Sequence, residues 1–152
     1  MAGLLAGIAR RARPRGPMEV LDRAEVTLAG GVAGDFRGAM RGKPHRRQVT
    51  LIERGDWVAA TAEVGRVIAW QERRSNLLVE DLDLPQVSGV RLRIGADVVL
   101  EITRETDPCE RMEAVAPGLK AALLPDWRGG ACAMVVEEGT IAVGDAIRIE
   151  DA

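Results

Sequence analysis

The run Gly89-Val90-Arg91-Leu92-Arg93-Ile94-Gly95-Ala96-Asp97-Val98-Val99-Leu100 carries the clearest information about the fold. Apolar and polar residues alternate before Gly95, and a β-branched run follows it, which is typical of two strands joined by a tight turn. Residues 139–149 repeat this pattern around Gly144. Because such segments recur with few helices between them, we expect a mostly β fold with a few short helices, arranged as a closed or partly open β-barrel.

The other segments fit the same architecture. Strands are expected over residues 1–10, 20–28, 48–52 and 77–79, and a short helix over residues 53–64, closed by Gly65. In the turn at residues 30–35, glycines would supply positive φ angles and Asp35 would accept hydrogen bonds from backbone amides. Two arginine-rich segments, residues 10–17 and 36–47, are expected to be basic loops, the second of them mobile. The first is either solvated surface or the rim of a site that attracts an anion.

Composition limits the classes of function. The 152 residues, 47% of them hydrophobic and 29% charged, suit a single domain over residues 1–152. A net charge of -2 argues against a general binder of nucleic-acid polymers, and no stretch is long and apolar enough to span a membrane. Two cysteines make no secreted disulfide framework, so a cytoplasmic location is expected.

Cys109 is the candidate reactive group. It lies in Asp107-Pro108-Cys109-Glu110-Arg111-Met112, after a β-branched run that ends near Thr103. Asp107 resembles a helix N-cap, Pro108 suits the first helical position and Glu110 completes a capping box. Cys109 would then lie in the first helical turn, where the backbone N–H groups, with Arg104 and Arg111, favour a thiolate. A thiolate can ligate a metal, carry sulfur or attack an electrophile. The alternative is an ordinary small residue in a loop.

Three further features have a chemical and a structural interpretation. The segment Arg73-Arg74-Ser75-Asn76 contains groups that pair with phosphate, although on its own it is also typical of a solvated strand edge. His45 is the only histidine, which excludes a His-rich metal site, and it is expected at the surface. Cys132 lies within an apolar run and is expected to fill the core.

Taken in order, several of these pieces resemble the MOSC domain, the family named for the C-terminal domain of molybdenum cofactor sulfurases. The resemblance rests on the turn at residues 30–35, the strand at 48–52, Arg74-Ser75-Asn76-Leu77, the Cys109 turn and the closing hairpin at 139–149. It extends over nearly the whole chain, which looks like the small stand-alone bacterial members of the family.

The resemblance implies a β-barrel with a cleft for the molybdenum cofactor, molybdopterin. Cys109 matches the family's cysteine, which ligates molybdenum in the members that reduce N-hydroxyl groups and is proposed to carry sulfur in others. Arg73, Arg74, Ser75 and Asn76 match the segment that helps to hold the pterin and phosphate. A soft thiolate suits molybdenum, and a basic edge with an asparagine suits a phosphate.

The chain also departs from larger relatives. It lacks the additional N-terminal barrel domain of the larger reductases and the pyridoxal-phosphate desulfurase domain of the sulfurases. Pyridoxal phosphate is not expected here, since it requires a Schiff-base lysine and only Lys43 and Lys120 are present. No cysteine cluster is available for an iron–sulfur centre. A reductase of this kind would therefore take its electrons from a separate protein.

Three hypotheses follow for the function. In the first, the chain is a molybdenum-cofactor oxidoreductase that reduces small N-hydroxylated compounds, with Cys109 as metal ligand. In the second, it is a sulfur carrier or cofactor chaperone, in which Cys109 receives a persulfide from a cysteine desulfurase. In the third, it is a non-catalytic binding domain for an anionic partner.

Overall fold

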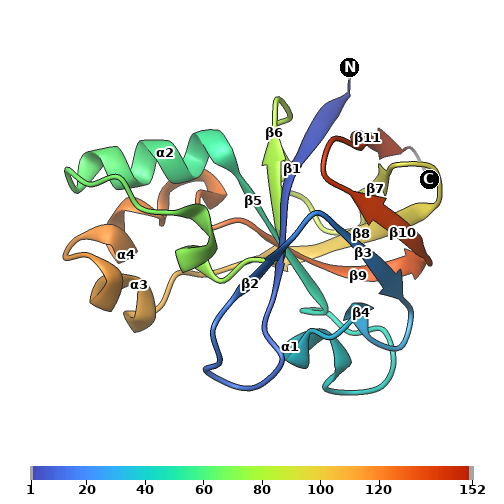
Figure 1. Cartoon of the computed structure of the whole chain (residues 1–152). Coiled ribbons are helices and arrows are strands. Elements are labelled where there is room, and N and C mark those ends of the chain that lie inside the picture. The colour runs from blue at the N-terminus through green and yellow to red at the C-terminus, as the bar shows by residue number, and fades with distance from the viewer. Residues whose placement is uncertain (1, 151–152) are drawn as a thin grey trace.

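Seven strands close into a barrel in the computed structural model, which describes residues 2–150 (Figure 1). The order around the barrel is β11-β7-β8-β9-β5-β6-β1, and pairing of β1 with β11 completes the circle. All neighbours are antiparallel except β5 and β6, which are parallel. The bounds are β1 (Gly3–Arg10), β5 (Val49–Glu53), β6 (Leu77–Glu80), β7 (Arg91–Ile94), β8 (Val98–Glu105), β9 (Ala131–Glu137) and β11 (Ala146–Glu150). The expected β-barrel is confirmed in its closed form.

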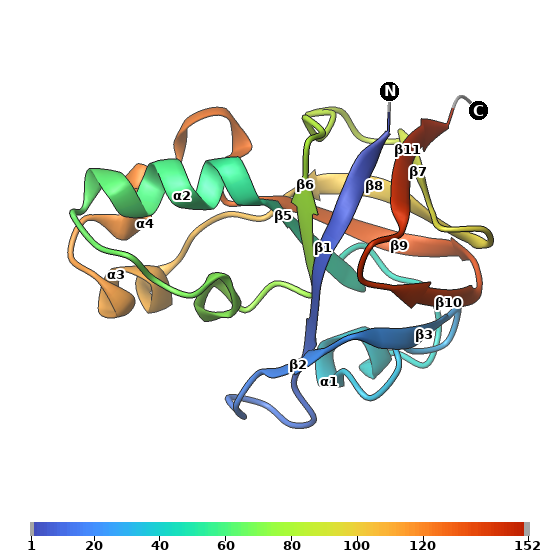
Figure 2. The same cartoon turned by 45° about the horizontal axis from the view of Figure 1, so that its top comes forward.

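A smaller sheet lies beside the barrel. It contains β3 (Arg23–Thr27), β4 (Gly31–Val32) and β10 (Gly139–Ala142), while β2 (Glu19–Leu21) extends the barrel sheet by pairing with β1. The short helix α1 (Phe36–Ala39) follows β4 and lies near this sheet (Figure 2). Asp35 caps α1, because its side chain accepts from the amide nitrogens of Gly38 at 3.0 Å and Arg11 at 3.1 Å. The role expected for Asp35 is confirmed, whereas residues 36–39 of the expected loop are helical.

The remaining helices gather on one side of the barrel (Figures 1 and 2). They are α2 (Arg54–Glu63), α3 (Glu110–Val115) and α4 (Leu119–Ala122), with short 3₁₀ turns at Trp70–Arg73 and Pro125–Trp127. Helix α2 belongs to the crossover that two parallel neighbours such as β5 and β6 require. It ends before Gly65, whose φ of +73° suits a helix C-terminus, as the sequence predicts. None of the helices within residues 2–150 is long and apolar enough to span a membrane.

Two hydrophobic clusters share the strands β5 and β6. Leu51 and Leu77 point into the barrel, whereas their neighbours Ile52 and Leu78 pack outward against the helices, as alternation along a strand requires. Trp57 of α2 belongs to the outer cluster. Its Nε1 donates to the carbonyl of Ile68 at 2.8 Å, which ties the helix to the segment that follows it. Strands β5 and β6 therefore lie between the barrel interior and the helical layer.

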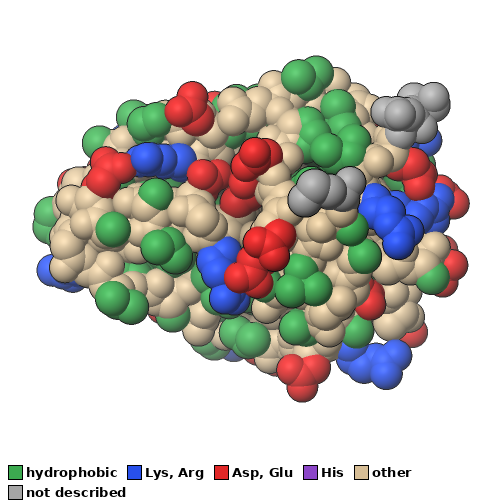
Figure 3. Space-filling view, turned by 90° about the horizontal axis from the view of Figure 1, so that it is seen from above, with side chains coloured by type: hydrophobic (Ala, Val, Ile, Leu, Met, Phe, Trp, Pro, Cys, Tyr) green, Lys and Arg blue, Asp and Glu red, His purple; other side chains and the backbone are tan. Residues whose placement is uncertain are grey.

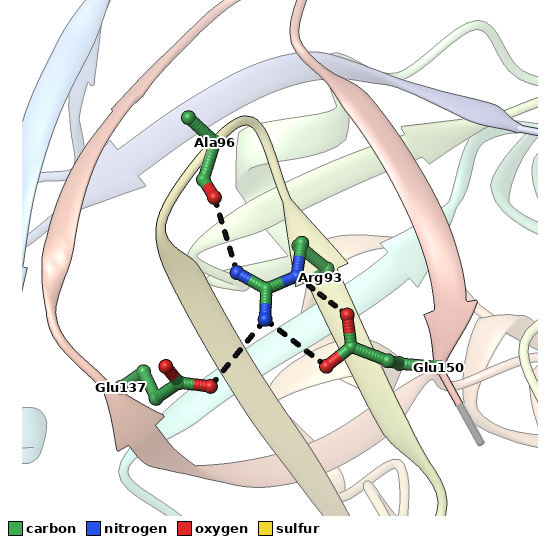
Figure 4. A network of polar contacts seen from close by, with 4 residues as sticks. All are labelled: Arg93, Ala96, Glu137 and Glu150. Carbon is green, nitrogen blue, oxygen red and sulfur yellow. Dashed lines mark hydrogen bonds and ion pairs between the residues drawn. The ribbon is translucent and has the colours of Figure 1, made fainter.

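Ion pairs neutralise many of the arginines on the barrel. Arg93 donates to both carboxylate oxygens of Glu150, at 2.5 and 3.2 Å, and to the carbonyl of Ala96 at 3.0 Å (Figure 4). Glu137 lies 3.5 Å from the same guanidinium. On the face shown in Figure 3, acidic and basic side chains are intermixed. This arrangement contrasts with the site described below.

Candidate functional site

Cys109 lies at the N-cap of α3, between the end of β8 and the helix. Its backbone is extended (φ -129°, ψ -174°), its carbonyl accepts from Met112 N at 2.9 Å, and its exposed side chain makes no capping hydrogen bond. The predicted N-cap, Asp107, is therefore wrong by two residues. Pro108 precedes the helix instead of taking its first position, and Cys109 is the N-cap rather than a residue of the first turn. The thiol stands beside the start of the helix and is open to solvent.

Arg73 is buried rather than solvated, with 6% of its surface exposed. Its guanidinium donates from Nε to the carbonyl of Gly129 and from Nη2 to the carbonyl of Thr106, each at 3.0 Å. Gly129 has no room for a side chain, because a Cβ there would lie 2.5 Å from Thr106 O. Arg73 thus joins the turn after Trp70 to the segment that carries Cys109.

Arg74 and Ser75 line the pocket beside Cys109. Arg74 adopts φ +66°, a left-handed conformation that is uncommon for a residue with a side chain. It donates from Nη2 to the carbonyl of Gly16 at 2.5 Å, while its buried Nε has no partner in the described structure. Ser75 is only 1% exposed. The interpretation of residues 73–76 as a solvated strand edge is wrong, because Arg73, Ser75 and Asn76 are buried and Arg74 is half-buried.

Asn76 connects three strands. Its Oδ1 accepts from Thr50 N at 3.0 Å, and its Nδ2 donates to the carbonyl of Ala9 at 3.1 Å. Asn76 N also donates to Thr50 Oγ1 at 3.2 Å. Since both ends of the side-chain amide bind within the chain, Asn76 positions the start of β6 rather than lining the pocket.

The pocket beside Cys109 is small and strongly basic. Its volume is about 100 Å³, and no carboxylate lines it. Residues far apart in the sequence meet here, from the loop after β1, from α1 and from the segments before β5, β6 and α3. The lining residues are Arg11, Arg37, Arg47, Thr50, Arg73, Arg74, Ser75, Thr106, Cys109, Arg111 and Met112.

The arginines of this pocket repel one another. Burial lowers the pKa of Arg11, Arg37, Arg73 and Arg74, and neighbouring guanidiniums lower each of these pKa values further. Asp35 offsets part of the effect on Arg11 and Arg37. An arginine pKa is so high that all of these side chains still carry a charge. An anion in the pocket would relieve both the repulsion and the lost solvation.

Two buried nitrogens of the pocket lack hydrogen-bond partners among the described residues, namely Nε of Arg47 and Nε of Arg74. An unpaired buried donor costs free energy, on the order of 1–3 kcal/mol. Such donors usually mark a place where water, an ion or a ligand completes the hydrogen bonds. The pocket therefore fits an anionic group bearing several acceptor oxygens.

Cys132 lies on β9 and is fully buried, as the sequence predicts. Its Sγ lies 3.3 Å from Thr106 Oγ1. The two thiols are free. His45, expected at the surface, is half-buried, and its Nε2 lies 3.0 Å from the carbonyl of Arg37.

No local pattern in the sequence assigns Arg11, Arg37, Arg47, Thr50 or Thr106 to this site. The three arginines lie in the basic segments 10–17 and 36–47, whose charge is a usable signal. Nothing local shows that these two segments meet beside Cys109. Arg111, expected near Cys109, lines the pocket, and Arg104 lines a neighbouring one. In residues 2–150 no three His, Cys, Asp or Glu side chains gather as a metal site.

With this geometry established, comparison with known proteins identifies the family. The family model of the MOSC domain matches residues 30–148, so the chain belongs to this family. The matched region includes Arg47, residues 73–76 and Cys109, whereas Arg11 lies before it. No curated protein matches the chain at the level required for a confident relationship.

Solved structures share the fold at low sequence identity. The YuaD protein from Bacillus subtilis superposes with a TM-score of 0.83 at 18% identity, covering 100% of this chain and 97% of YuaD. YiiM from Geobacillus stearothermophilus gives 0.72 at 14% identity, over 98% of this chain and 75% of that protein. YiiM from Escherichia coli gives a TM-score of 0.70 at 13% identity, over 100% of this chain and 71% of that protein. These similarities support the fold.

Proposed function

We propose that this chain binds the molybdenum cofactor in the pocket beside Cys109 and reduces small N-hydroxylated compounds, with the Cys109 thiolate as a molybdenum ligand. The observation that carries the proposal is the meeting of an unengaged, exposed thiol with six arginines that line one pocket. Membership in the MOSC family, whose name refers to molybdenum cofactor sulfurases, supports the same assignment.

The residues present fit such a cofactor. A phosphate carries between one and two negative charges at neutral pH, and arginine forks bind its oxygens in pairs. Arg74 and Arg47 have buried donors without partners, so they are the best placed to hold the phosphate. Arg73 already uses two of its nitrogens on backbone carbonyls. Arg73 therefore contributes mainly its positive charge to the pocket and holds the segments around the pocket in position.

When bound, the cofactor supplies two-electron removal of an oxygen atom. The balance is R–NH–OH plus two electrons and two protons, giving R–NH₂ and water. Cys109 contributes the soft ligand that suits molybdenum. The exposed position of Cys109 leaves a path for a small substrate, and we propose that the electrons come from a separate donor protein. The proposal involves neither a nucleic-acid polymer nor a membrane partner, and it assumes a cytoplasmic setting.

A turnover assay with a chemical donor tests this function. Protein from a host that makes the cofactor is mixed anaerobically with reduced methyl viologen and an aromatic hydroxylamine, and amine formation is measured. We expect turnover by wild type, loss of turnover in Cys109→Ser, and retention in Cys132→Ala, which removes the buried thiol instead. Equal turnover by Cys109→Ser would show that this cysteine is not the ligand.

Transfer of sulfur is the second candidate, because an exposed thiol is also accessible to a partner enzyme. Here Cys109 would receive a persulfide from a cysteine desulfurase and deliver the sulfur to the cofactor. Intact-mass measurement after incubation with a desulfurase and cysteine should then show one added sulfur in wild type and none in Cys109→Ser. If no added sulfur appears in wild type, this candidate fails. Pyridoxal phosphate belongs to that partner and is not expected in this chain.

A further inference from the structure

A second basic pocket adjoins the one beside Cys109. It has a volume of about 550 Å³ and is lined by Arg41, Lys43, Pro44, His45, Arg46, Arg47 and Arg104. Arg47 lines both pockets, so the two adjoin at this residue. No carboxylate lines either pocket. We call the larger one the basic trough.

The wall of the trough is fixed to the barrel. His45 Nε2 lies 3.0 Å from the carbonyl of Arg37, and His45 Nδ1 accepts from Arg47 N at 3.4 Å. These contacts define the neutral tautomer with its proton on Nε2. The hydroxyl of Thr103, on β8, donates to the carbonyl of Arg46. The backbone that carries Arg46 and Arg47 is therefore held in place before any ligand binds.

The charge in the two pockets exceeds what one phosphate neutralises. Ten of the 21 lysines and arginines of the chain line them, although the net charge of the chain is -2. None of these ten makes an ion pair with another described residue. Outside the pockets, by contrast, cations such as Arg54, Arg93 and Arg128 are paired with glutamates. One phosphate brings at most about two negative charges.

We propose that the basic trough is a second anion subsite, which binds the phosphate of a phosphorylated substrate whose N-hydroxyl group reaches the pocket beside Cys109. This assignment rests on the proposed function and specifies its substrate class. Arg41, Arg46 and Arg104 are exposed, as suits a site that must bind and release its ligand at each turnover. Because Arg47 lines both pockets, the subsite lies next to the thiol pocket. A phosphate-bearing extension of the cofactor has the same chemistry and is the alternative source.

Binding to cofactor-free protein tests the subsite without any need for activity. Inorganic pyrophosphate is titrated calorimetrically at fixed ionic strength into wild type and into the double variant Arg41→Gln/Arg46→Gln. The matched control is Arg23→Gln/Arg148→Gln, which removes two exposed charges from β3 and β11 outside both pockets. We expect the trough variant to bind about tenfold more weakly or worse, because each phosphate contact is charge-assisted. Equal weakening in the control variant would overturn the subsite.

Kinetics then assign the source of the phosphate. N4-hydroxycytidine 5′-monophosphate and N4-hydroxycytidine are compared as substrates of the loaded protein. We expect a lower KM for the phosphorylated compound in wild type, and loss of most of this preference in the trough variant. If both proteins reduce the two compounds with the same KM ratio, the subsite assignment fails while the proposed function stands. If neither compound is reduced by a protein that does reduce an aromatic hydroxylamine, the substrate assignment fails while the proposed function stands. If none of the three compounds is reduced, the proposed function fails as well.

Two other outcomes would also overturn the substrate assignment. Release of one nucleotide per molybdenum from acid-treated wild type, lost in the trough variant, would assign the trough to an extended cofactor. Fluorescence anisotropy with single-stranded oligonucleotides of increasing length tests a polymer ligand. Tighter binding as the oligonucleotide lengthens, without binding of pyrophosphate, would show a nucleic-acid surface instead.

Discussion

Arg73 donates a hydrogen bond from Nη2 to the carbonyl oxygen of Thr106 at 3.0 Å, and this contact joins the two segments that carry the candidate chemistry. Thr106 lies three residues before Cys109, and Arg73 lies directly before Arg74. The contact is buried on both sides, with 6% of Arg73 and 3% of Thr106 exposed. The guanidinium of Arg73 therefore sets where the Cys109 thiol stands relative to the arginine pocket.

Replacing Arg73 by glutamine should destabilise the fold. The variant loses two charge-assisted hydrogen bonds, each on the order of 1.5–3 kcal/mol, and leaves two carbonyls unpaired. The variant also removes the repulsion between Arg73 and Arg47, which would raise stability. This gain should be smaller than the loss, because charges that are partly solvated repel each other weakly. We expect urea unfolding to show a loss of about 2 kcal/mol or more. Arg111→Gln, at an exposed residue of the same pocket, is the control and should change stability little. Equal stability of wild type and Arg73→Gln would contradict this account.

Asn76→Asp tests whether Asn76 is structural. The substitution keeps the shape of the side chain but turns the Nδ2 donor into an oxygen that faces the carbonyl of Ala9. A buried charge next to an acceptor is unfavourable, so we expect thermal unfolding at a clearly lower temperature, equivalent to about 2 kcal/mol or more. The molybdenum content per folded molecule should stay near that of wild type. A normal melting temperature combined with loss of molybdenum would instead place Asn76 in direct contact with the cofactor.

The acidic group at the start of α2 predicts a pH dependence of stability. Burial, followed by the charge of Asp56, raises the pKa of Glu53 from 4.5 to about 7. A raised carboxyl pKa means that the folded protein holds a proton which the unfolded chain has released. The free energy of unfolding should therefore fall as the pH rises from about 4.5 to about 7. Glu53→Gln should flatten this fall and be more stable than wild type at pH 8, as measured by urea unfolding. Parallel pH profiles of the two proteins would refute the assignment to Glu53.

The local features of the chain were predictable because they depend on near neighbours in sequence. Alternation around Gly95 predicts the β7–β8 hairpin, which is confirmed. The hairpin predicted around Gly144 is wrong: both strands form, but β10 pairs with β3 in the small sheet, whereas β11 pairs with β7 and β1 in the barrel. Asp35 follows its expected role as a backbone acceptor. Helix α3 begins two residues later than the capping pattern at Asp107 predicts, because the backbone of Cys109 is still extended.

The pocket itself depends on contacts between distant segments. Residues 73–76 resemble a solvated edge in the sequence, whereas contacts with distant residues such as Ala9, Thr106 and Gly129 bury most of them. No periodicity in the sequence predicts these contacts. Arg11 comes from one basic segment, and Arg37 and Arg47 come from the other; only the tertiary fold brings both segments beside Cys109. Charge in a segment shows that an anion can bind, whereas the tertiary fold decides which arginines share it.

The role of Cys109 as a molybdenum ligand is the central claim, and metal content tests it most directly. Wild type, Cys109→Ser and Cys132→Ala are purified anaerobically from a host that makes the cofactor, and molybdenum per protein is measured by elemental analysis. Because the thiol of Cys109 is exposed and makes no capping bond, the serine variant should fold normally. We expect near-stoichiometric molybdenum in wild type and Cys132→Ala, and little in Cys109→Ser. Absence of molybdenum from all three, or equal metal in Cys109→Ser and wild type, would contradict the claim.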